Sequence, residues 1–215
     1  MPQFGFTDDE WNHPVQVAQI VPRTKAEGPG ERFAVWFQGC PFRCPGCCNP
    51  EMLSFQGGRR TTIGNVLTQL ARAANDHPSL EGITLLGGEP FAHARAGALL
   101  ARGARNLNLS VMVFTGYRFE ELETNSDSEV KHLIAEADLL VDGLYKQDQP
   151  DFDRRWIGSA NQQIHFLTDR YSAEDACWQE PDTLEIRLEN RDVTINGFPA
   201  KSAVGLWKRT GERDA

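Results

Sequence analysis

The residues in this chain best suited to chemistry are four closely spaced cysteines, Cys40, Cys44, Cys47 and Cys48. The first three have the spacing C-x3-C-x2-C and directly follow an apolar run that predicts a strand. Three thiolates on one short loop can bind three irons of a cubane iron-sulfur cluster and leave the fourth iron open to another ligand. We therefore expect Cys40, Cys44 and Cys47 to be metal ligands.

The residues between these cysteines suit a compact metal-binding loop, residues 39–50, called the cysteine loop below. Pro41, Pro45 and Gly46 favour tight turns, and no acidic side chain lies among them, so a soft metal is favoured. A structural zinc site with Cys48 as fourth ligand is the alternative. Neighbouring residues point in opposite directions along an extended backbone, which weakens Cys48 as a ligand beside Cys47.

Two further segments with chemical potential follow predicted strands. Gly87-Gly88-Glu89-Pro90 is expected on the same rim as the cysteine loop, where glycines admit a ligand close to the backbone and Glu89 can hold an ammonium group. The alternative is a turn leading into a helix with proline at its first position. Phe114-Thr115-Gly116-Tyr117 also follows a strand, and its alternative is a plain strand, turn and helix start.

Hydrophobic periodicity indicates the elements that position these segments. The predicted strands are 15–20, 33–37, 82–86, 109–114, 138–141 and 164–168, with a closing hairpin of 183–188 and 192–195. The predicted helices are 63–74, 93–104 and 128–135. Strands that alternate with helices indicate a parallel sheet.

The chain length limits the form that this sheet can take. A complete eight-unit α/β barrel needs about 250 residues, and the glycine-rich fingerprint of a flat doubly wound sheet is absent after the first strands. We therefore predict an α/β fold, a partial and laterally open barrel of about six parallel strands with a C-terminal hairpin. It spans residues 15–200, between loosely ordered tails at 1–14 and 201–215 that Trp11 and Trp207 anchor.

Composition narrows the functional classes. A formal net charge of -8 disfavours nucleic acid as a partner, and the absence of a signal sequence or a long apolar run predicts a cytoplasmic protein that binds no membrane. In a reducing compartment clustered cysteines favour metal binding over disulfides, whereas the isolated Cys177 is expected to be an ordinary thiol. No motif of a serine hydrolase, a P-loop nucleotide hydrolase or a zinc peptidase occurs.

The segment EGPGERFAVWFQGCPFRCPGCCNPE, residues 27–51, resembles the cluster loop of radical S-adenosylmethionine (SAM) proteins, in particular activating proteins of anaerobic ribonucleotide reductase. The GGEP turn, a TGY-x-FEEL segment from Thr115, Asp142-Gly143, and Gly158-Ser159 with Asn161-Gln162 extend the resemblance over about residues 27 to 200. The chain departs from this family at Cys48, where an aromatic residue or histidine is more usual, and near Arg155.

The resemblance implies a radical SAM oxidoreductase with a [4Fe-4S] cluster that reductively cleaves S-adenosyl-L-methionine to a 5′-deoxyadenosyl radical. It also implies a low-potential electron donor and, as protein substrate, a larger glycyl radical enzyme such as an anaerobic ribonucleotide reductase. No catalytic side chain is assigned. The residues expected at the cofactors, besides the three cluster cysteines, are Gly46, Cys48, Gly87, Gly88, Glu89, Pro90, Thr115 and Gly116.

Two other functions are compatible with the same residues. One is a radical SAM enzyme that modifies a small molecule or peptide directly. The other is a non-enzymatic zinc-binding interaction module.

Overall fold

The computed structural model describes residues 4–189 and 192–198. Its helices are α1 (Asp8–Trp11), α2 (Ile63–Asp76), α3 (Ala94–Asn106), α4 (Phe119–Glu123) and α5 (Ser128–Glu136), with short 3-10 helices η1 (Pro50–Met52), η2 (Pro90–His93) and η3 (Ala176–Gln179). Its strands are β1 (Pro14–Thr24), β2 (Glu31–Phe37), β3 (Arg59–Thr62), β4 (Leu80–Gly87), β5 (Ser110–Phe114), β6 (Leu139–Asp142), β7 (Gln163–Phe166), β8 (Leu184–Glu189) and β9 (Asp192–Gly197).

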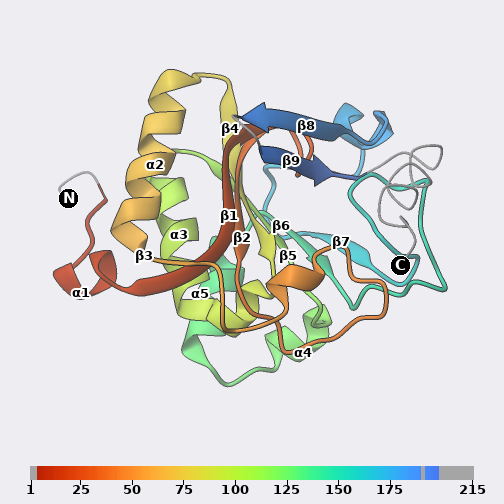
Figure 1. Ribbon diagram of the computed structural model, residues 1–215, viewed down its shortest axis with the longest axis horizontal. Coiled ribbons are helices and arrows are strands. Elements are labelled where there is room, and N and C mark those ends of the chain that lie inside the picture. The colour runs from red at the N-terminus through yellow and green to blue at the C-terminus, as the bar shows by residue number, and fades with distance from the viewer. Residues whose placement is uncertain (1–3, 190–191, 199–215) are drawn as a thin grey trace.

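The central sheet has the strand order β3-β1-β2-β4-β5-β6-β7 (Figure 1). Strands β2, β4, β5 and β6 run parallel, whereas β1, β3 and β7 pair antiparallel with their neighbours. The prediction of about six parallel strands was therefore wrong, because four of the described strands run parallel. The connection between β1 and β2, residues 25–30, is too short for the crossover that parallel neighbours require.

The main core lies between this sheet and the helices α2, α3 and α5, which share one of its faces (Figure 1). Helix α2 begins where the Thr62 side chain accepts the main-chain N–H of Asn65, and its apolar stripe, including Leu67 and Leu70, is fully buried. Among the described residues, no helix combines the length and the apolar character that a bilayer crossing demands.

Helices α3 and α5 approach closely because Gly97 has no side chain. A Cβ at Gly97 would lie 2.9 Å from a methyl carbon of Leu133 on α5. The same arrangement occurs between α3 and α2, where a Cβ at Gly103 would lie 2.4 Å from Leu67. These glycines keep the helix layer tight over the parallel strands, whose carboxyl ends carry the predicted site.

Residues 4–13 differ from the loosely ordered tail that was expected. Phe4 is buried, α1 begins with a capping box between Thr7 and Glu10, and the Trp11 ring lies where a Cβ of Gly64 on α2 would be. Trp11 therefore anchors the segment, as expected. Trp207 lies outside the described residues.

The opposite face of the sheet carries a fully buried arginine near the start of β2. The Arg32 guanidinium donates to the Thr84 hydroxyl at 3.0 Å, to the Ser110 hydroxyl at 2.5 Å and to the Ile83 carbonyl at 2.5 Å. The Tyr171 hydroxyl, which accepts from Arg32 at 3.3 Å, belongs to the C-terminal part of the chain. These bonds compensate the buried charge and connect three strands.

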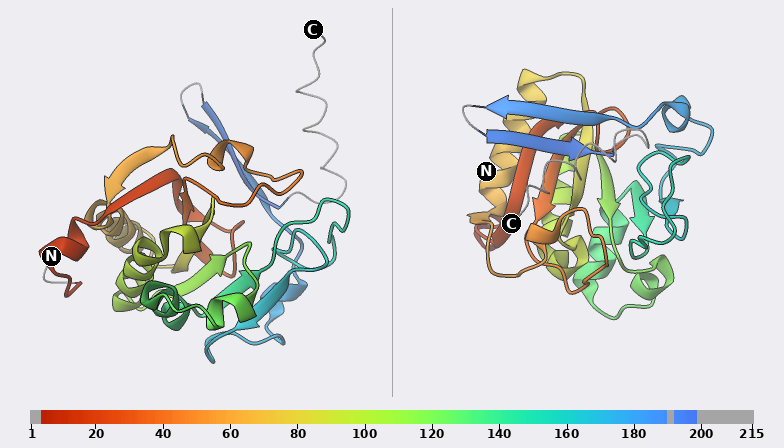
Figure 2. Two further views of the ribbon diagram at one scale, coloured as in Figure 1. Left: turned by 90° about the horizontal axis from the view of Figure 1, so that it is seen from below. Right: turned by 45° about the vertical axis from the view of Figure 1, so that its right-hand side comes forward.

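The β8–β9 hairpin is antiparallel, as predicted, and crosses this second face (Figure 2). The Asn196 amide donates to the hydroxyl of Thr24 at 3.0 Å and to the carboxylate of Glu27 at 3.0 Å. Helices therefore cover one side of the sheet, and the C-terminal segment contributes to covering the other.

Candidate cofactor site

The carboxyl ends of β2, β4, β5 and β6 lie at one edge of the sheet, because these strands are parallel and in matching register. The cysteine loop follows β2, the GGEP turn follows β4, Thr115-Gly116 follow β5, and Gly143 follows β6. The sequence-based prediction that the cysteine loop and the GGEP turn share a rim is therefore confirmed. This edge is also where ligands bind in parallel α/β sheets.

Main-chain and amide contacts fix the start of the cysteine loop. The buried Gln38 side chain donates to the carbonyls of Glu51 at 3.1 Å and Ser54 at 2.7 Å. The N–H of Gly39 donates to Met52, and that of Cys40 donates to Leu53. The loop is thus tied to the segment that follows it, with the cysteines between the two anchors.

Cys40, Cys44 and Cys47 form no disulfide and are half-buried, whereas Cys48 is exposed. Burial raises the pKa of Cys40 to about 11, opposed by the N–H of Phe42. Burial also raises the pKa of Cys44, opposed by the N–H of Tyr145. The pKa of Cys47 falls to about 6, first because the Cys48 thiol donates to it, and the same bond raises the pKa of Cys48.

This donor set fits an iron-sulfur cluster. Each of the three thiols accepts a main-chain N–H: Cys40 from Phe42, Cys44 from Tyr145 and Cys47 from Asn49. Cluster thiolates are stabilised by such hydrogen bonds. Among the described residues, no three His, Cys, Asp or Glu side chains group closely enough to hold a single metal ion. A cubane instead places its three thiolates on three separate irons.

The GGEP turn is bonded directly to the start of the cysteine loop. The N–H of Gly88 donates to the Phe37 carbonyl at 2.8 Å, and the N–H of Glu89 donates to the Gly39 carbonyl at 3.0 Å. A Cβ at Gly88 would lie 2.2 Å from that Gly39 oxygen. Glycine is therefore required at position 88 by the protein's own backbone, a reason that differs from the sequence-based expectation of cofactor approach alone.

Glu89 is 1 % exposed and accepts three hydrogen bonds. One carboxylate oxygen accepts the N–H of Phe91 at 2.9 Å and the hydroxyl of Thr115 at 2.8 Å. The other accepts the N–H of Gly116 at 2.8 Å. Burial raises the pKa of Glu89 to about 7, and these donors oppose the rise. Glu89 thus joins the GGEP turn to the end of β5, in addition to any contact with a ligand.

The remaining predicted residues lie at the same edge. Gly87 has a φ of +102° and abuts the backbone of Trp36, while Pro90 is buried at the start of η2. Gly46 has a φ of +72°, which favours glycine in the turn before Cys47. The structure thus brings the predicted residues together around the loop, with Thr115 and Gly116 joined to it through Glu89.

Sequence reasoning did not single out Glu27, which is fully buried on the second face of the sheet. Its carboxylate accepts the Asn196 amide, and burial raises its pKa to about 7. The acid directly before Gly28-Pro29-Gly30 was a visible signal, but the partner that buries it is 169 positions away. Tyr145 was missed for a different reason, because its contact with Cys44 uses the main chain.

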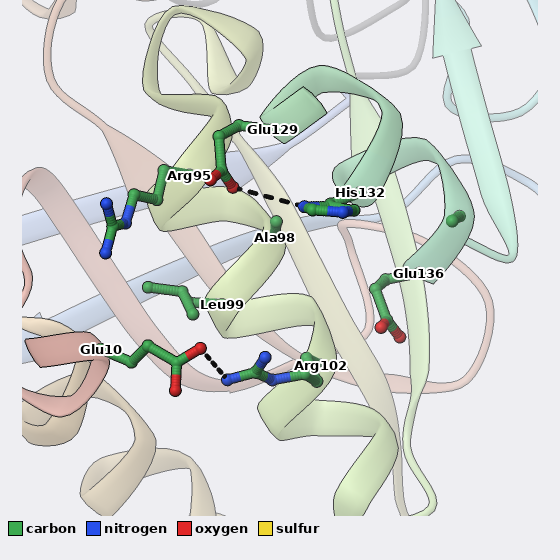
Figure 3. Close-up of a pocket in the computed structure, with 9 residues that line it drawn as sticks. Glu10, Arg95, Ala98, Leu99, Arg102, Glu129, His132 and Glu136 are labelled. Atoms are coloured by element: carbon green, nitrogen blue, oxygen red, sulfur yellow. Dashed lines mark hydrogen bonds and ion pairs between the residues drawn. The ribbon is translucent and has the colours of Figure 1, made fainter. Parts of the chain in front are cut away.

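Hollows in the described part of the surface include a pocket in the helix layer and one beside the cysteine loop. A pocket of about 330 Å³ lies in the helix layer, where Glu10 of α1 pairs with Arg102 of α3 at 2.7 Å and Glu129 lies 3.7 Å from His132 on α5 (Figure 3). None of the predicted site residues lines it. A second hollow, of about 520 Å³, lies beside the cysteine loop between Pro45 and residues 145–148.

Comparisons with known proteins agree with this arrangement. Residues 26–165 match the family model of the 4Fe-4S single cluster domain. The chain is similar to the anaerobic ribonucleoside-triphosphate reductase-activating proteins of Vibrio cholerae serotype O1, Haemophilus influenzae and Escherichia coli K12, each 32% identical. These matches cover 70%, 68% and 69% of this chain and 97%, 95% and 97% of the relatives. The resemblance seen in the sequence is thereby confirmed.

Proposed function

The chain belongs to the family of anaerobic ribonucleoside-triphosphate reductase-activating proteins, and we propose that it installs a glycyl radical on such a reductase. The observation that supports this most strongly is the joining of the C-x3-C-x2-C loop to the GGEP turn by the Gly88–Phe37 and Glu89–Gly39 hydrogen bonds. Two segments that the sequence separates thereby form one edge of the sheet.

Within this proposal Cys40, Cys44 and Cys47 hold a [4Fe-4S] cluster. When bound, the cluster would supply the one electron that cleaves SAM into methionine and a 5′-deoxyadenosyl radical, and this radical would take hydrogen from a glycine Cα. The chain's own residues position these groups. The cysteine loop presents the thiolates, while Gly46, Cys48, Gly87, Gly88, Glu89, Pro90, Thr115 and Gly116 surround the SAM position.

We also propose that the curved sheet is a partial barrel, open at its side, which admits a protruding loop of the reductase. The sheet ends at β3 and β7, which do not pair with each other within the described residues. A protein substrate suits such an opening, because a small molecule is usually held in an enclosed pocket. A low-potential electron donor and a cytoplasmic location belong to the same proposal.

The test is radical transfer between purified proteins. The reduced protein, SAM and the anaerobic reductase encoded by the same organism are incubated without oxygen, and the reductase is examined by electron paramagnetic resonance. We expect a protein radical doublet that collapses when the reductase is grown with α-deuterated glycine. Deuterium should also appear in 5′-deoxyadenosine.

Cys44→Ala is the negative control, and Cys177→Ala, whose thiol lies in the separate cluster around Trp156, is the matched positive control. If a small molecule or free peptide supplies the deuterium and no reductase glycine does, the protein is a radical SAM enzyme of another kind. If no 5′-deoxyadenosine forms at all, the radical SAM assignment itself is overturned.

A further inference from the structure

Cys44 differs from the other two proposed cluster ligands in the origin of its hydrogen bond. Cys40 and Cys47 accept N–H groups from Phe42 and Asn49, inside the cysteine loop. Cys44 accepts the N–H of Tyr145, which belongs to the turn after β6, and its own N–H contributes less. The environment of the Cys44 sulfur therefore depends on how that turn is held.

Two neighbouring side-chain amides hold the turn that contains Tyr145. The Asn161 amide donates to the Leu144 carbonyl at 2.9 Å, and the Gln162 amide donates to the Gly143 carbonyl at 2.9 Å. The Leu144 carbonyl belongs to the peptide group whose N–H is that of Tyr145. Fixing this carbonyl therefore fixes the direction of the N–H that faces Cys44.

The acceptor ends of the same amides are also used. The Gln162 side-chain oxygen accepts the N–H groups of Gly158 at 3.0 Å and Ser159 at 3.1 Å. The Asn161 oxygen accepts the Ser159 hydroxyl at 2.9 Å, and that hydroxyl in turn accepts the N–H of Lys146 at 3.1 Å. Both amides are thus held at each end, so they can act as rigid braces.

The braced turn packs directly on the cysteine loop. A Cβ at Gly46 would lie 2.6 Å from the side-chain oxygen of Gln147. A Cβ at Gly116 would lie 2.7 Å from the Phe42 ring and 3.0 Å from Leu144. The turn thus meets the cysteine loop directly at Gly46, and Phe42 of the loop and Leu144 of the turn both lie against Gly116.

We propose that Asn161 and Gln162 are positioning residues that hold the Tyr145 N–H on the Cys44 sulfur and so raise the reduction potential of the cluster. An N–H donor stabilises the more negative, reduced cluster more than the oxidised one, and hydrogen bonds to cluster sulfurs are known to set the potential. This inference rests on the proposed function, because it needs Cys44 to be a cluster ligand.

The test compares Asn161→Ala and Gln162→Ala with Gln163→Ala. Gln163 is the next residue in the chain, carries the same amide and has an exposed side chain, so it is a matched control. Each reconstituted protein is analysed for iron and sulfide, titrated potentiometrically, and studied in its reduced state for deuteron couplings after exchange into D2O. The couplings report N–H groups bonded to sulfur, which a merely structural role would leave unchanged.

We expect both brace variants to keep their iron and to have a reduced-to-oxidised ratio about tenfold lower at a fixed potential, a shift of 59 mV for one electron. One deuteron coupling should be weakened in both, whereas Gln163→Ala should match the wild type. Unchanged potential and couplings in iron-replete variants would overturn the inference and leave the proposed function intact. A wild-type protein that binds no cluster would instead overturn the proposed function. If Asn161→Ala and Gln162→Ala lose iron and Gln163→Ala does not, the two amides hold the cysteine loop together and do not tune the reduction potential, which also overturns the inference.

Discussion

The carboxylate of Glu89 accepts the main-chain N–H of Gly116 at 2.8 Å, so one buried acid joins the ends of β4 and β5. The same carboxylate also accepts the hydroxyl of Thr115 and the main-chain N–H of Phe91. Replacing Glu89 by alanine leaves three donors without this acceptor, at a cost of about 1–3 kcal/mol for each that stays buried and unpaired. We expect Glu89→Ala to lower the free energy of unfolding by about 3 kcal/mol, measured by urea denaturation of the apoprotein.

Glu89→Gln separates the structural role of this residue from its charge. Glutamine keeps one acceptor oxygen, so its loss of stability should be about half as large. Glu120→Ala, an exposed acid on α4, is the control and should stay within about 0.5 kcal/mol of the wild type. Equal stability of Glu89→Ala and Glu120→Ala would contradict the bridging role.

Gly88→Ala should damage the cysteine loop as well as any cofactor contact. The added Cβ would lie 2.2 Å from the Gly39 carbonyl oxygen, and backbone cannot yield as a flexible side chain can. We expect reconstituted Gly88→Ala to bind less than half of the wild-type iron. Gly5→Ala is the control for a backbone change without a clash, because nothing lies within 4 Å of its Cβ position although its φ of +63° strains a side chain, and it should keep its iron. Full iron binding with weaker SAM binding would restore the simpler view that Gly88 only admits the cofactor.

Stability should depend on pH through Glu27. Burial raises its pKa from 4.5 to about 7, so between these values the folded protein binds more protons than the unfolded chain. The stabilising contribution is complete below about pH 4.5 and is lost as the pH rises through 7, by about 3 kcal/mol in all. The difference in unfolding free energy between wild type and Glu27→Gln should therefore fall from pH 5 to pH 8. A difference that is constant with pH would exclude this titration.

The cysteine variants test the proposed ligand set. The reconstituted wild type should bind about four irons and four sulfides, and alanine at Cys40, Cys44 or Cys47 should abolish this. The Cys48→Ala and Cys177→Ala proteins should retain the cluster and its absorption at roughly 400 nm. If Cys48→Ala loses metal as completely as Cys44→Ala, a closed four-cysteine site, such as a zinc site, replaces the three-ligand assignment.

The sequence predicted strands and helices well where apolar periodicity was strong, as in α2 and the buried strands. It did not predict β3, because Arg59-Arg60-Thr61-Thr62 contains no apolar residue and forms a strand only through pairing with β1. It also overestimated the parallel strands, since a pattern of apolar residues carries no direction. Pairing partners are tertiary information.

For the site, the sequence predicted which segments meet, because residues after parallel strands share an edge. It could not reveal that Gly88 faces Gly39, or that Glu89 is already engaged by Thr115 and Gly116, because such contacts depend on side-chain direction and depth. The contact between the Tyr145 N–H and Cys44 could not be predicted from the sequence either. Every residue except proline has a main-chain N–H, so the residue type at position 145 does not indicate that it donates to Cys44.

The edge strand β3 has a consequence for the behaviour of the protein in solution. An open sheet ends in unpaired backbone groups that can recruit a strand from another molecule and begin aggregation. Here β3 is only four residues long, and its first two residues, Arg59 and Arg60, are exposed. Charged, short edges resist such strand addition. The same two arginines that made β3 unrecognisable in the sequence therefore disfavour strand addition at this edge of the sheet.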